Sequence, residues 1–374
     1  MSEWKETKLK DAGCKILSGY AFKSEDYSNT GIPLIKIGNI QNKVVSIDDN
    51  GTFIKADLIT EKLSKYLLCN EDILISMTGQ GSVGRVGKLQ LADKQKALLN
   101  QRVGKFITTN SEVNIKYLYY VISSPTYQEY LFNTGSGSGQ PNLSPELILE
   151  TEIILPPLPE QELIAEVLSS LDDKIDLLHR NNKTLEQLAE TLFRQWFVED
   201  TSASEITIGE ITKITSGKSL NRSHFLEKGT YPIYGSNGII GWTNNYTFDE
   251  NLIITGRVGT LGTVKIIDEK CWISDNVLII KPNSELYKYP IYFSMKGYDF
   301  ESLNVGSTQP LLTQGELNKQ LVVILDEYKL LSCKMYFDEL FNKIKQNLTQ
   351  IQKLETLRDT LLPKFMSGVV RVEN

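Results

Sequence analysis

Three glycines form the pattern in this sequence that is most typical of nucleotide binding. Gly79, Gly81 and Gly84 satisfy the GxGxxG spacing and follow the apolar segment 72–76, which predicts a strand. A dinucleotide loop also needs a helix that begins at the glycines and an acidic residue about twenty positions later. Residues 85–90 have the composition of a second strand, so we interpret the glycines as a hairpin turn. A nucleotide-binding enzyme that uses the Gly-rich loops stays an alternative.

Motifs for other chemistries are missing from the sequence. It has no GxxxxGK[ST] phosphate loop, no HExxH metal pair and no GxSxG nucleophile elbow. It also lacks the Asn-Pro-Pro or Asp-Pro-Pro motif of adenine methyltransferases. The four cysteines lie far apart without a CxxC pair, and only two histidines accompany them. We therefore expect no catalytic residue, no metal and no cofactor in this chain.

Basic and amide side chains at predicted turns could contact DNA phosphates or base edges. Arg85 and Lys88 accompany the glycine turn, and Arg257 and Lys265 accompany its counterpart later in the chain. The ordinary alternative for any one of these side chains is a solvated surface position. The candidate DNA-binding residues of the first half are Lys23, Lys36, Arg85, Lys88, Gln101, Arg102 and Gln140. Those of the second half are Lys218, Arg222, Asn237, Arg257, Lys265, Asn276 and Gln309.

The chain repeats itself with a spacing of 169 residues. GSGQPNL at 137–143 reappears as GSTQPLL at 306–312, and the strand-like residues 153–155 match 322–324. Shorter matches precede these with altered spacing: SG at 18–19 and 216–217, GSVG at 81–84 and GTLG at 259–262, NQRV at 100–103 and SDNV at 274–277. The repeat predicts the order globule, helix, globule, helix. Short apolar runs between Gly and Asn make each globule mainly β with one helical stretch.

Heptad patterns predict two long helices, one after each globule. Their predicted seam consists of Leu171, Ile175, Leu178, Asn182, Leu185, Leu192, Leu340, Ile344, Asn347, Ile351, Leu354 and Leu361. A pseudo-two-fold relation between the halves requires antiparallel helices, and we expect Asn182 to face Asn347 and to penalise slipped registers. Further apolar residues predict contact with other subunits. They include Leu163, Val167, Leu177, Leu188, Phe193 and Phe197.

The net charge of −6 comes from one segment. Residues 156–200 hold four basic and ten acidic side chains, whereas 1–155 hold 17 of each and 201–325 hold 11 and 12. The globules are therefore free to carry a basic DNA face, although neutral domains without one are the ordinary alternative. The N-terminus lacks a secretory signal, and no run approaches the roughly 18 apolar residues of a membrane helix, so we expect a cytoplasmic protein.

The sequence resembles the specificity subunit of type I restriction-modification systems. The likeness rests on two globules with GQP-like turns and on LPPLPEQELIAEVLSSLDDKIDLLHRNNKTLEQLAETLFRQWF at 155–197. The second copy reads LDEYK at 325–329 where PLPEQ is expected. The resemblance implies an α+β fold with two similar, mainly-β target recognition domains, at 1–155 and 201–325. Long spacer helices at 156–200 and 326–374 separate and follow them and pair as an antiparallel, pseudo-two-fold coiled coil.

The resemblance also implies a non-catalytic subunit for DNA recognition. Each target recognition domain would read one half of a bipartite site in double-stranded DNA, and two modification subunits would dock on the helices. Those subunits methylate adenine N6 with S-adenosylmethionine, and restriction subunits cleave DNA with ATP and Mg, so that the complex defends against phage. A coiled-coil assembly adaptor that reads no DNA is the other alternative.

Overall fold

The computed structural model describes residues 4–48, 50–109, 112–136, 141–249 and 251–372. The chain forms two compact units. The first unit comprises residues 1–177 and 350–374, and the second comprises residues 178–349. These units do not follow the boundaries predicted at 155, 200 and 325, because each long helix contributes one segment to each unit. The boundaries of the target recognition domains remain a prediction.

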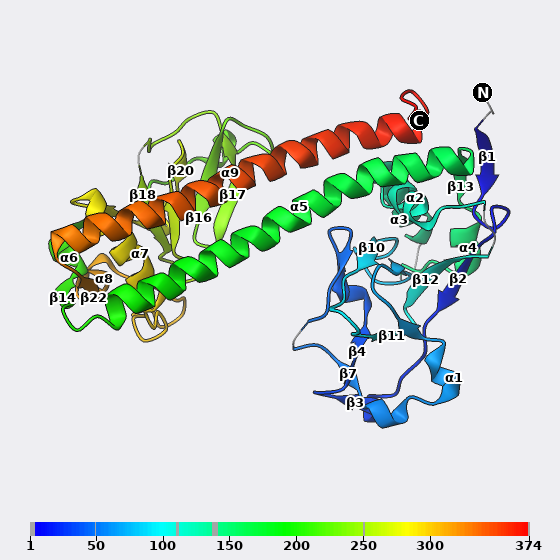
Figure 1. The fold of residues 1–374 in the computed structure, drawn as a ribbon, viewed down its shortest axis with the longest axis horizontal. Helices are drawn as coiled ribbons and strands as arrows, with labels where there is room; N and C mark the ends of the chain where they lie inside the picture. The colour runs from blue at the N-terminus through cyan, green and yellow to red at the C-terminus, as the bar shows by residue number, and fades with distance from the viewer. Residues whose placement is uncertain (1–3, 49, 110–111, 137–140, 250, 373–374) are drawn as a thin grey trace. The chain divides into compact units, whose positions relative to one another are not determined.

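The first unit is built on a six-stranded sheet (Figure 1). The strands of this unit are β1 (Lys5–Lys8), β2 (Cys14–Ser18), β3 (Tyr27–Ser28), β4 (Ile32–Ile35), β5 (Ile40–Gln41), β6 (Val44–Val45), β7 (Phe53–Ile54), β8 (Leu67–Leu68), β9 (Ile73–Ser76), β10 (Val86–Leu89), β11 (Ala97–Leu99), β12 (Val103–Thr108) and β13 (Glu152–Leu155). The main sheet has the order β2-β12-β9-β10-β6-β5. A five-stranded sheet, β3-β7-β4-β11-β8, and the pair β1-β13 complete the β structure.

Short helices connect and cover these strands. They are η1 (Ser24–Asp26), η2 (Ile37–Asn39), η3 (Ala56–Leu58), α1 (Glu61–Ser64), α2 (Ile115–Ile122), α3 (Pro125–Gly135) and α4 (Pro145–Leu149). The Asn114 side chain caps α2 by accepting hydrogen bonds from the amides of Lys116 and Tyr117. All residues from Tyr117 to Ile122 are buried, so α2 is the helix that packs its whole second half into the core.

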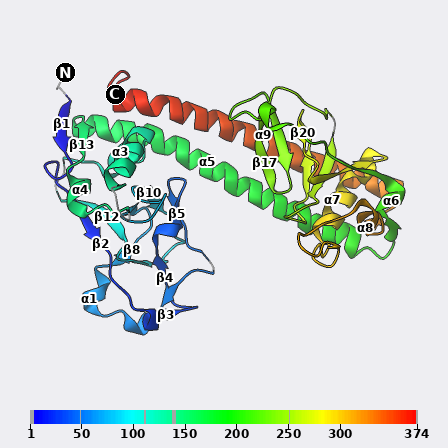
Figure 2. The ribbon, with the colours of Figure 1, turned by 180° about the vertical axis from the view of Figure 1, so that it is seen from behind.

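The second unit repeats this architecture in a smaller form (Figure 2). Its strands are β14 (Ser204–Thr207), β15 (Thr212–Ser216), β16 (Tyr231–Gly235), β17 (Gly238–Thr243), β18 (Leu252–Gly256), β19 (Lys265–Ile267), β20 (Trp272–Ile273), β21 (Val277–Pro282) and β22 (Leu321–Ile324). Its short helices are α6 (Ile208–Ile211), η5 (Arg222–His224), η6 (Glu285–Tyr287), α7 (Lys288–Lys296) and α8 (Gln314–Asn318). The sheet order β15-β21-β18-β19 reproduces β2-β12-β9-β10, and the parallel pair β16-β20 reproduces β4-β11. The predicted internal repeat and the α+β class are confirmed.

Two long helices follow the two sets of sheets. α5 spans Leu158–Phe193 and continues as the π-helical turn η4 (Arg194–Val198), and α9 spans Glu327–Met366. Both helices begin at positions that keep the 169-residue repeat, although the second copy lacks the PLPEQ segment. In the described part of the chain no helix is both long and apolar enough to cross a membrane.

The segments of α5 and α9 run antiparallel within each unit. In the first unit, Asp172 of α5 pairs with Arg358 of α9 at 2.9 Å, and Glu160 lies 3.8 Å from Arg371, which follows α9. In the second unit, Asn182 and Asp200 contact Asn347 and Lys329 respectively. In both units the partner number falls as the α5 number rises. The predicted antiparallel pairing is confirmed.

The end of α9 completes the core of the first unit. Leu362 and Phe365 are buried in one cluster with Ile164 and Leu168 of α5 and with Tyr117 of α2. Burial of apolar side chains of this size stabilises a fold by about 1.5–3 kcal/mol each. The first unit therefore depends on a segment that lies about 200 residues away along the chain.

A polar contact fixes the same helix segments. Tyr120 Oη donates to Asp172 Oδ2 at 2.7 Å, and Arg358 Nη1 donates to Asp172 Oδ1 at 2.9 Å. Burial, and secondly the Asp172 carboxylate, raise the pKa of Tyr120 far above its usual range. The hydroxyl therefore stays protonated and serves as a donor.

Aromatic side chains close the second unit. Phe193 of α5 stacks on Phe293 of α7 with ring centroids 5.1 Å apart, and Phe293 lies 5.1 Å from Phe337 of α9. Phe197 and Tyr289 are buried in the same cluster. The expectation that Phe193 and Phe197 face other subunits is wrong, because the core of their own unit buries both rings.

A pair of asparagines lies between the helices of the second unit. Asn347 Nδ2 donates to Asn182 Oδ1 at 2.7 Å, and the two residues are 2% and 6% exposed. The predicted pairing of these residues is confirmed. The buried Asn182 Nδ2 has no partner in the described part of the chain. A polar layer in an apolar seam costs stability in other registers, where each amide would be left alone.

We predict that Asn347→Leu destabilises the chain by about 1–3 kcal/mol, because it leaves Asn182 Oδ1 buried without a donor. The double variant Asn182→Leu with Asn347→Leu should recover this loss, since leucine has a similar volume and needs no partner. Chemical denaturation of the purified chain measures both effects. Equal stability of Asn347→Leu and the double variant would contradict the pairing.

Candidate nucleic-acid interface

One end of the main sheet in the first unit is made of loops. β2 and β9 end here, and β12 and β10 begin here, as their antiparallel registers require. The amide of Met77 donates to Arg102 O at 2.9 Å, and the amide of Leu143 donates to Met77 O at 2.7 Å. We call this end the loop edge. In the first unit it comprises residues 18–20, 77–85, 100–103 and 141–143.

The second unit has a loop edge with the same backbone bonds. The amide of Arg257 donates to Asn276 O at 2.8 Å, and the amide of Leu312 donates to Arg257 O at 2.8 Å. This edge comprises residues 216–218, 257–262, 274–277 and 310–312. Arg257 is therefore equivalent to Met77 and not to Arg85, because the glycine loop of the second copy is shorter.

The glycine loops are hairpin turns. Residues 77–85 lead from β9 directly into its antiparallel neighbour β10, which confirms the hairpin interpretation. Gly84 and Gly262 have φ of 79° and 80°, values that favour glycine. A Cβ on either residue would lie 3.0 Å from Leu131 or 2.9 Å from Phe300, in the helical layer beneath the loop. The glycines thus allow a tight turn over a helical layer.

A second pair of glycines allows close backbone contact. A Cβ on Gly19 would lie 2.2 Å from Asn100 O, and one on Gly217 would lie 2.2 Å from Ser274 O. Both separations are far shorter than van der Waals contact. This explains why SG recurs at 18–19 and 216–217: the chain after β2 or β15 must touch the turn before β12 or β21.

Most of the candidate DNA-binding residues lie at or beside the loop edges. Asn237 follows Ser236, whose Oγ donates to the carbonyls of Val258 and Asn276. Lys265 Nζ lies 3.1 Å from where a Cβ of Gly238 would sit. The candidates brought together here are Arg85, Gln101 and Arg102 in the first unit and Lys218, Asn237, Arg257, Lys265, Asn276 and Gln309 in the second.

These loop edges offer charges that are free to meet a ligand. Arg85, Arg102 and Lys218 are exposed and form no ion pair with a carboxylate of the described residues. Arg257 is half-buried and donates from Nη1 to Ser216 Oγ at 3.0 Å, and its Nε has no described partner. Unpaired guanidinium and ammonium groups at one sheet end suit the binding of a polyanion.

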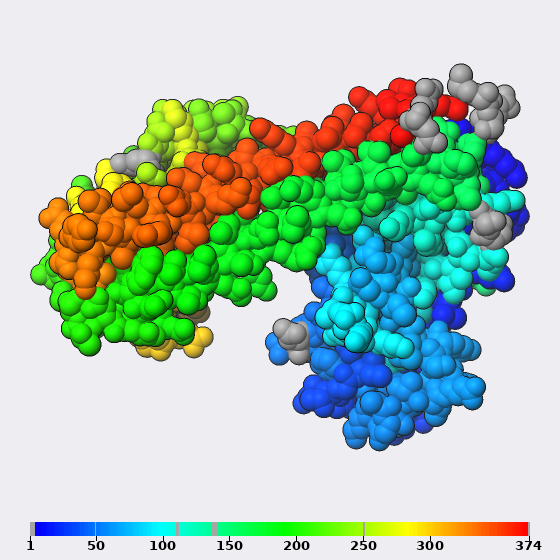
Figure 3. Space-filling view, viewed as in Figure 1, coloured from blue at the N-terminus to red at the C-terminus, as the bar shows by residue number. Residues whose placement is uncertain are grey.

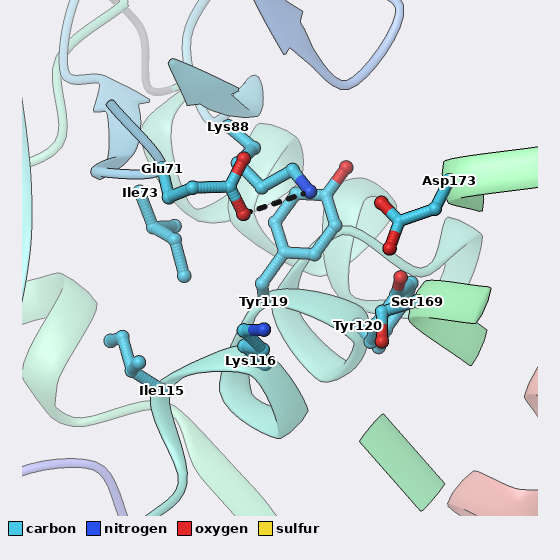
Figure 4. A pocket seen from close by; sticks show the side chains of 9 residues that line it. All are labelled: Glu71, Ile73, Lys88, Ile115, Lys116, Tyr119, Tyr120, Ser169 and Asp173. Carbon is cyan, nitrogen blue, oxygen red and sulfur yellow. Dashed lines mark ion pairs between the residues drawn. The ribbon is translucent and has the colours of Figure 1, made fainter. Parts of the chain in front are cut away.

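Lys88 does not lie at the loop edge. It is in β10 opposite Ile73, at the other end of the strand, and pairs with Glu71 at 3.2 Å. Figure 4 shows its side chain beside Tyr119, in a pocket that Asp173 of α5 also lines. The turn prediction was wrong for Lys88, because strand register decides which end of a strand carries each side chain.

Lys23 and Lys36 have partners of their own. Lys36 Nζ donates to Thr52 Oγ1 at 2.6 Å and lies 4.6 Å from the centre of the Tyr27 ring. Lys23 pairs with Glu25 at 3.2 Å on the surface.

The two remaining candidates are Arg222 and Gln140. Arg222 is exposed in η5, between the loop edge and Leu226, which bridges to Trp242 near the far end of β17. Gln140 lies outside the described residues.

Two residues of the loop edges were not among the sequence-based candidates. Asp275 is exposed at the position equivalent to Gln101, and its Oδ2 accepts a hydrogen bond from Ser219 at 2.7 Å. Tyr20 is equivalent to Lys218, because their amides donate to Leu99 O and Ile273 O respectively. The match between NQRV and SDNV could have identified Asp275, whereas a search for basic and amide side chains passed over it.

The long helices offer a separate apolar surface. Leu188 of α5 is 44% exposed, and Tyr328, Leu331 and Met335 of α9 are 81%, 52% and 63% exposed. These residues belong to the second unit, in which the adjoining parts of α5 and α9 reach the surface (Figure 3). We call these four residues the helix patch. Leu163 and Val167, by contrast, are partly buried in their own unit.

Comparison with known proteins assigns the chain to a family. The family model for the type I restriction modification DNA specificity domain matches residues 1–187 and 202–324. The chain belongs to this family. The specificity subunit of the type I restriction enzyme MjaIX of Methanocaldococcus jannaschii is 25% identical to it over 415 residues, which cover 99% of this chain and 94% of that subunit.

Other specificity subunits match over different lengths. The EcoBI specificity subunit of Escherichia coli is 29% identical over 205 residues, which cover 54% of this chain and 38% of that subunit. The crystal structure of the S subunit of a type I system from M. genitalium has a TM-score of 0.64 at 19% identity and covers 97% of this chain and 96% of that one. The latter shows a shared fold. The resemblance seen in the sequence is confirmed.

We predict that Gly19→Ala destabilises the chain by at least about 1–3 kcal/mol, because the new methyl group would overlap Asn100 O. Gly38→Ala is the matched control, since nothing lies within 4 Å of a Cβ at that position. Thermal unfolding compares the two variants. A Gly19→Ala protein as stable as Gly38→Ala would contradict the close approach at the loop edge.

Proposed function

We propose that this chain is the DNA-reading subunit of a type I restriction-modification complex and that each loop edge reads one half of a bipartite site. One observation carries the proposal: the same loop edge occurs twice, with the same backbone bonds and different exposed side chains. A repeated frame with different side chains suits the reading of two different short sequences. Phosphate contacts would position each edge, and base contacts would specify the sequence.

The helix patch would bind the modification subunits. Exposed apolar side chains such as Tyr328 and Met335 lose contact with water when a partner covers them, which favours association. The acidic segment 156–200 on and after α5 would add charge complementarity to a basic partner surface. The modification subunits would use S-adenosylmethionine to methylate adenine, and restriction subunits would use ATP and Mg to cleave. This chain would contribute recognition alone.

We predict that exchanging residues 1–155 for the corresponding part of another specificity subunit changes one half of the methylated site and leaves the other half and the spacing intact. The loop edge of the first unit consists entirely of residues from this segment. Methylome sequencing of a host that expresses the chimera with the modification subunits measures the site. A change in both halves would show that the two edges read DNA jointly.

We predict that the triple variant Arg85→Ala, Arg102→Ala and Arg257→Ala binds DNA more weakly and with a smaller salt dependence. Each lost phosphate contact should reduce the slope of log affinity against log salt by about 0.9, so the full effect is up to about 2.7. Fluorescence anisotropy of the reconstituted complex with its DNA site, over a series of salt concentrations, measures the slope.

The control removes the same charge elsewhere. Lys5, Lys15 and Lys213 are exposed, and the last two start β2 and β15, at the ends of these strands opposite the loop edges. Their triple alanine variant should bind DNA with an unchanged slope. Equal slopes for both triple variants and the unsubstituted chain would refute DNA binding at the loop edges and would leave an adaptor role.

A further inference from the structure

Two tight turns occupy equivalent places in the loop edges. Residues 100–103 join β11 to β12, and residues 274–277 join β20 to β21. Each turn is closed by a hydrogen bond from its fourth amide to its first carbonyl, Val103 to Asn100 at 2.9 Å and Val277 to Ser274 at 3.1 Å. Such a bond is typical of a β-turn, which presents its two central side chains outward.

The surrounding backbone holds both turns in the same way. The amides of Gly19 and Gly217 donate to the fourth residue of each turn, at 3.1 and 3.0 Å. The amides of Asn100 and Ser274 donate to the parallel strands β4 and β16, at 3.2 and 2.9 Å. The carbonyls of Arg102 and Asn276 accept from Met77 and Arg257, as described above. The backbone positions of the turns are therefore fixed before any ligand binds.

The central side chains differ between the turns. The first turn carries Gln101 and Arg102, and the second carries Asp275 and Asn276. All four residues are exposed. The side chains of Arg102 and Asn276 form no hydrogen bond or ion pair with other described residues. Two equivalent, rigid positions thus present a guanidinium in one unit and an amide in the other, both free to bind.

We propose that Arg102 specifies a guanine in the half-site of the first unit and that Asn276 specifies an adenine in the half-site of the second. This inference rests on the proposed function. In the major groove, arginine donates two hydrogen bonds to guanine O6 and N7, and asparagine pairs in the same bidentate way with adenine N6 and N7. Each pair discriminates against other bases by a factor that typically exceeds tenfold.

The neighbouring residues favour base edges over phosphates. Asp275 places a carboxylate next to Asn276, and its charge would repel a phosphate. The same carboxylate can accept a hydrogen bond from cytosine N4 in the groove. Gln101 beside Arg102 is neutral, so it neither repels nor attracts the DNA backbone. Hence the turns are suited to the floor of a groove, while Arg85 and Lys218 at the surrounding loops are suited to phosphates.

The test measures binding of the reconstituted complex to duplexes in which each base pair of the methylated site is replaced in turn. The unsubstituted complex should lose about tenfold or more in affinity when one guanine of the first half-site is replaced. Arg102→Asn should lose this discrimination at that position alone, and Asn276→Arg should lose discrimination at one adenine of the other half-site. The controls Lys15→Asn and Asn245→Arg make the same kinds of charge change at exposed positions outside the loop edges and should leave every discrimination factor unchanged.

The possible results separate the inference from the proposed function. If Arg102→Asn weakens binding to all duplexes by one common factor, Arg102 contacts a phosphate and the base assignment is wrong. If both variants keep the discrimination of the unsubstituted complex, the turns read no bases, although the DNA-reading function stands. If the unsubstituted complex discriminates between none of the duplexes, the proposed function itself fails, and this inference fails with it.

Discussion

Burial of Leu362 and Phe365 of α9 against Ile164 and Leu168 of α5 is the contact on which the first unit depends, because it joins the two ends of the chain in one core. The second unit uses the reverse exchange, in which Phe193 of α5 enters a core with α9. Each sheet structure is thus completed by a helix segment that belongs to the other half of the repeat. This arrangement requires both helices to be long, antiparallel and held in one register, which the Asn182–Asn347 pair favours in the second unit.

The same physical logic links the frame to recognition. Backbone hydrogen bonds and closely approached glycines such as Gly19 and Gly217 define both loop edges, so that the side chains between them are free to differ. Arg257 occupies the place of Met77, and Asn276 occupies that of Arg102. Stability and specificity therefore reside in different atoms of the same turns. A chain built in this way can change its ligand without changing its fold.

Much of the fold could be predicted from the sequence, because its signals are local or periodic. The heptads predicted α5 and α9, and the repeat predicted two copies of one sheet. The candidate site was only partly predictable. Lys88 was expected at a turn, yet the register of β10 against β9 places it at the opposite end of the strand beside Glu71. Asp275 was missed, since only the tertiary bonds around its turn make it equivalent to Gln101. Side-chain direction depends on strand pairing, which residue types alone do not determine.

The central claim is that this chain alone determines a bipartite DNA site through two separate reading edges. The most direct measurement is methylome sequencing of a host that expresses the chain with its modification subunits, compared with a host that expresses those subunits without it. The account predicts methylated adenines in one motif with two different specified halves and a fixed number of unspecified base pairs between them. A continuous motif, a motif with identical halves or methylation that does not depend on this chain would contradict it.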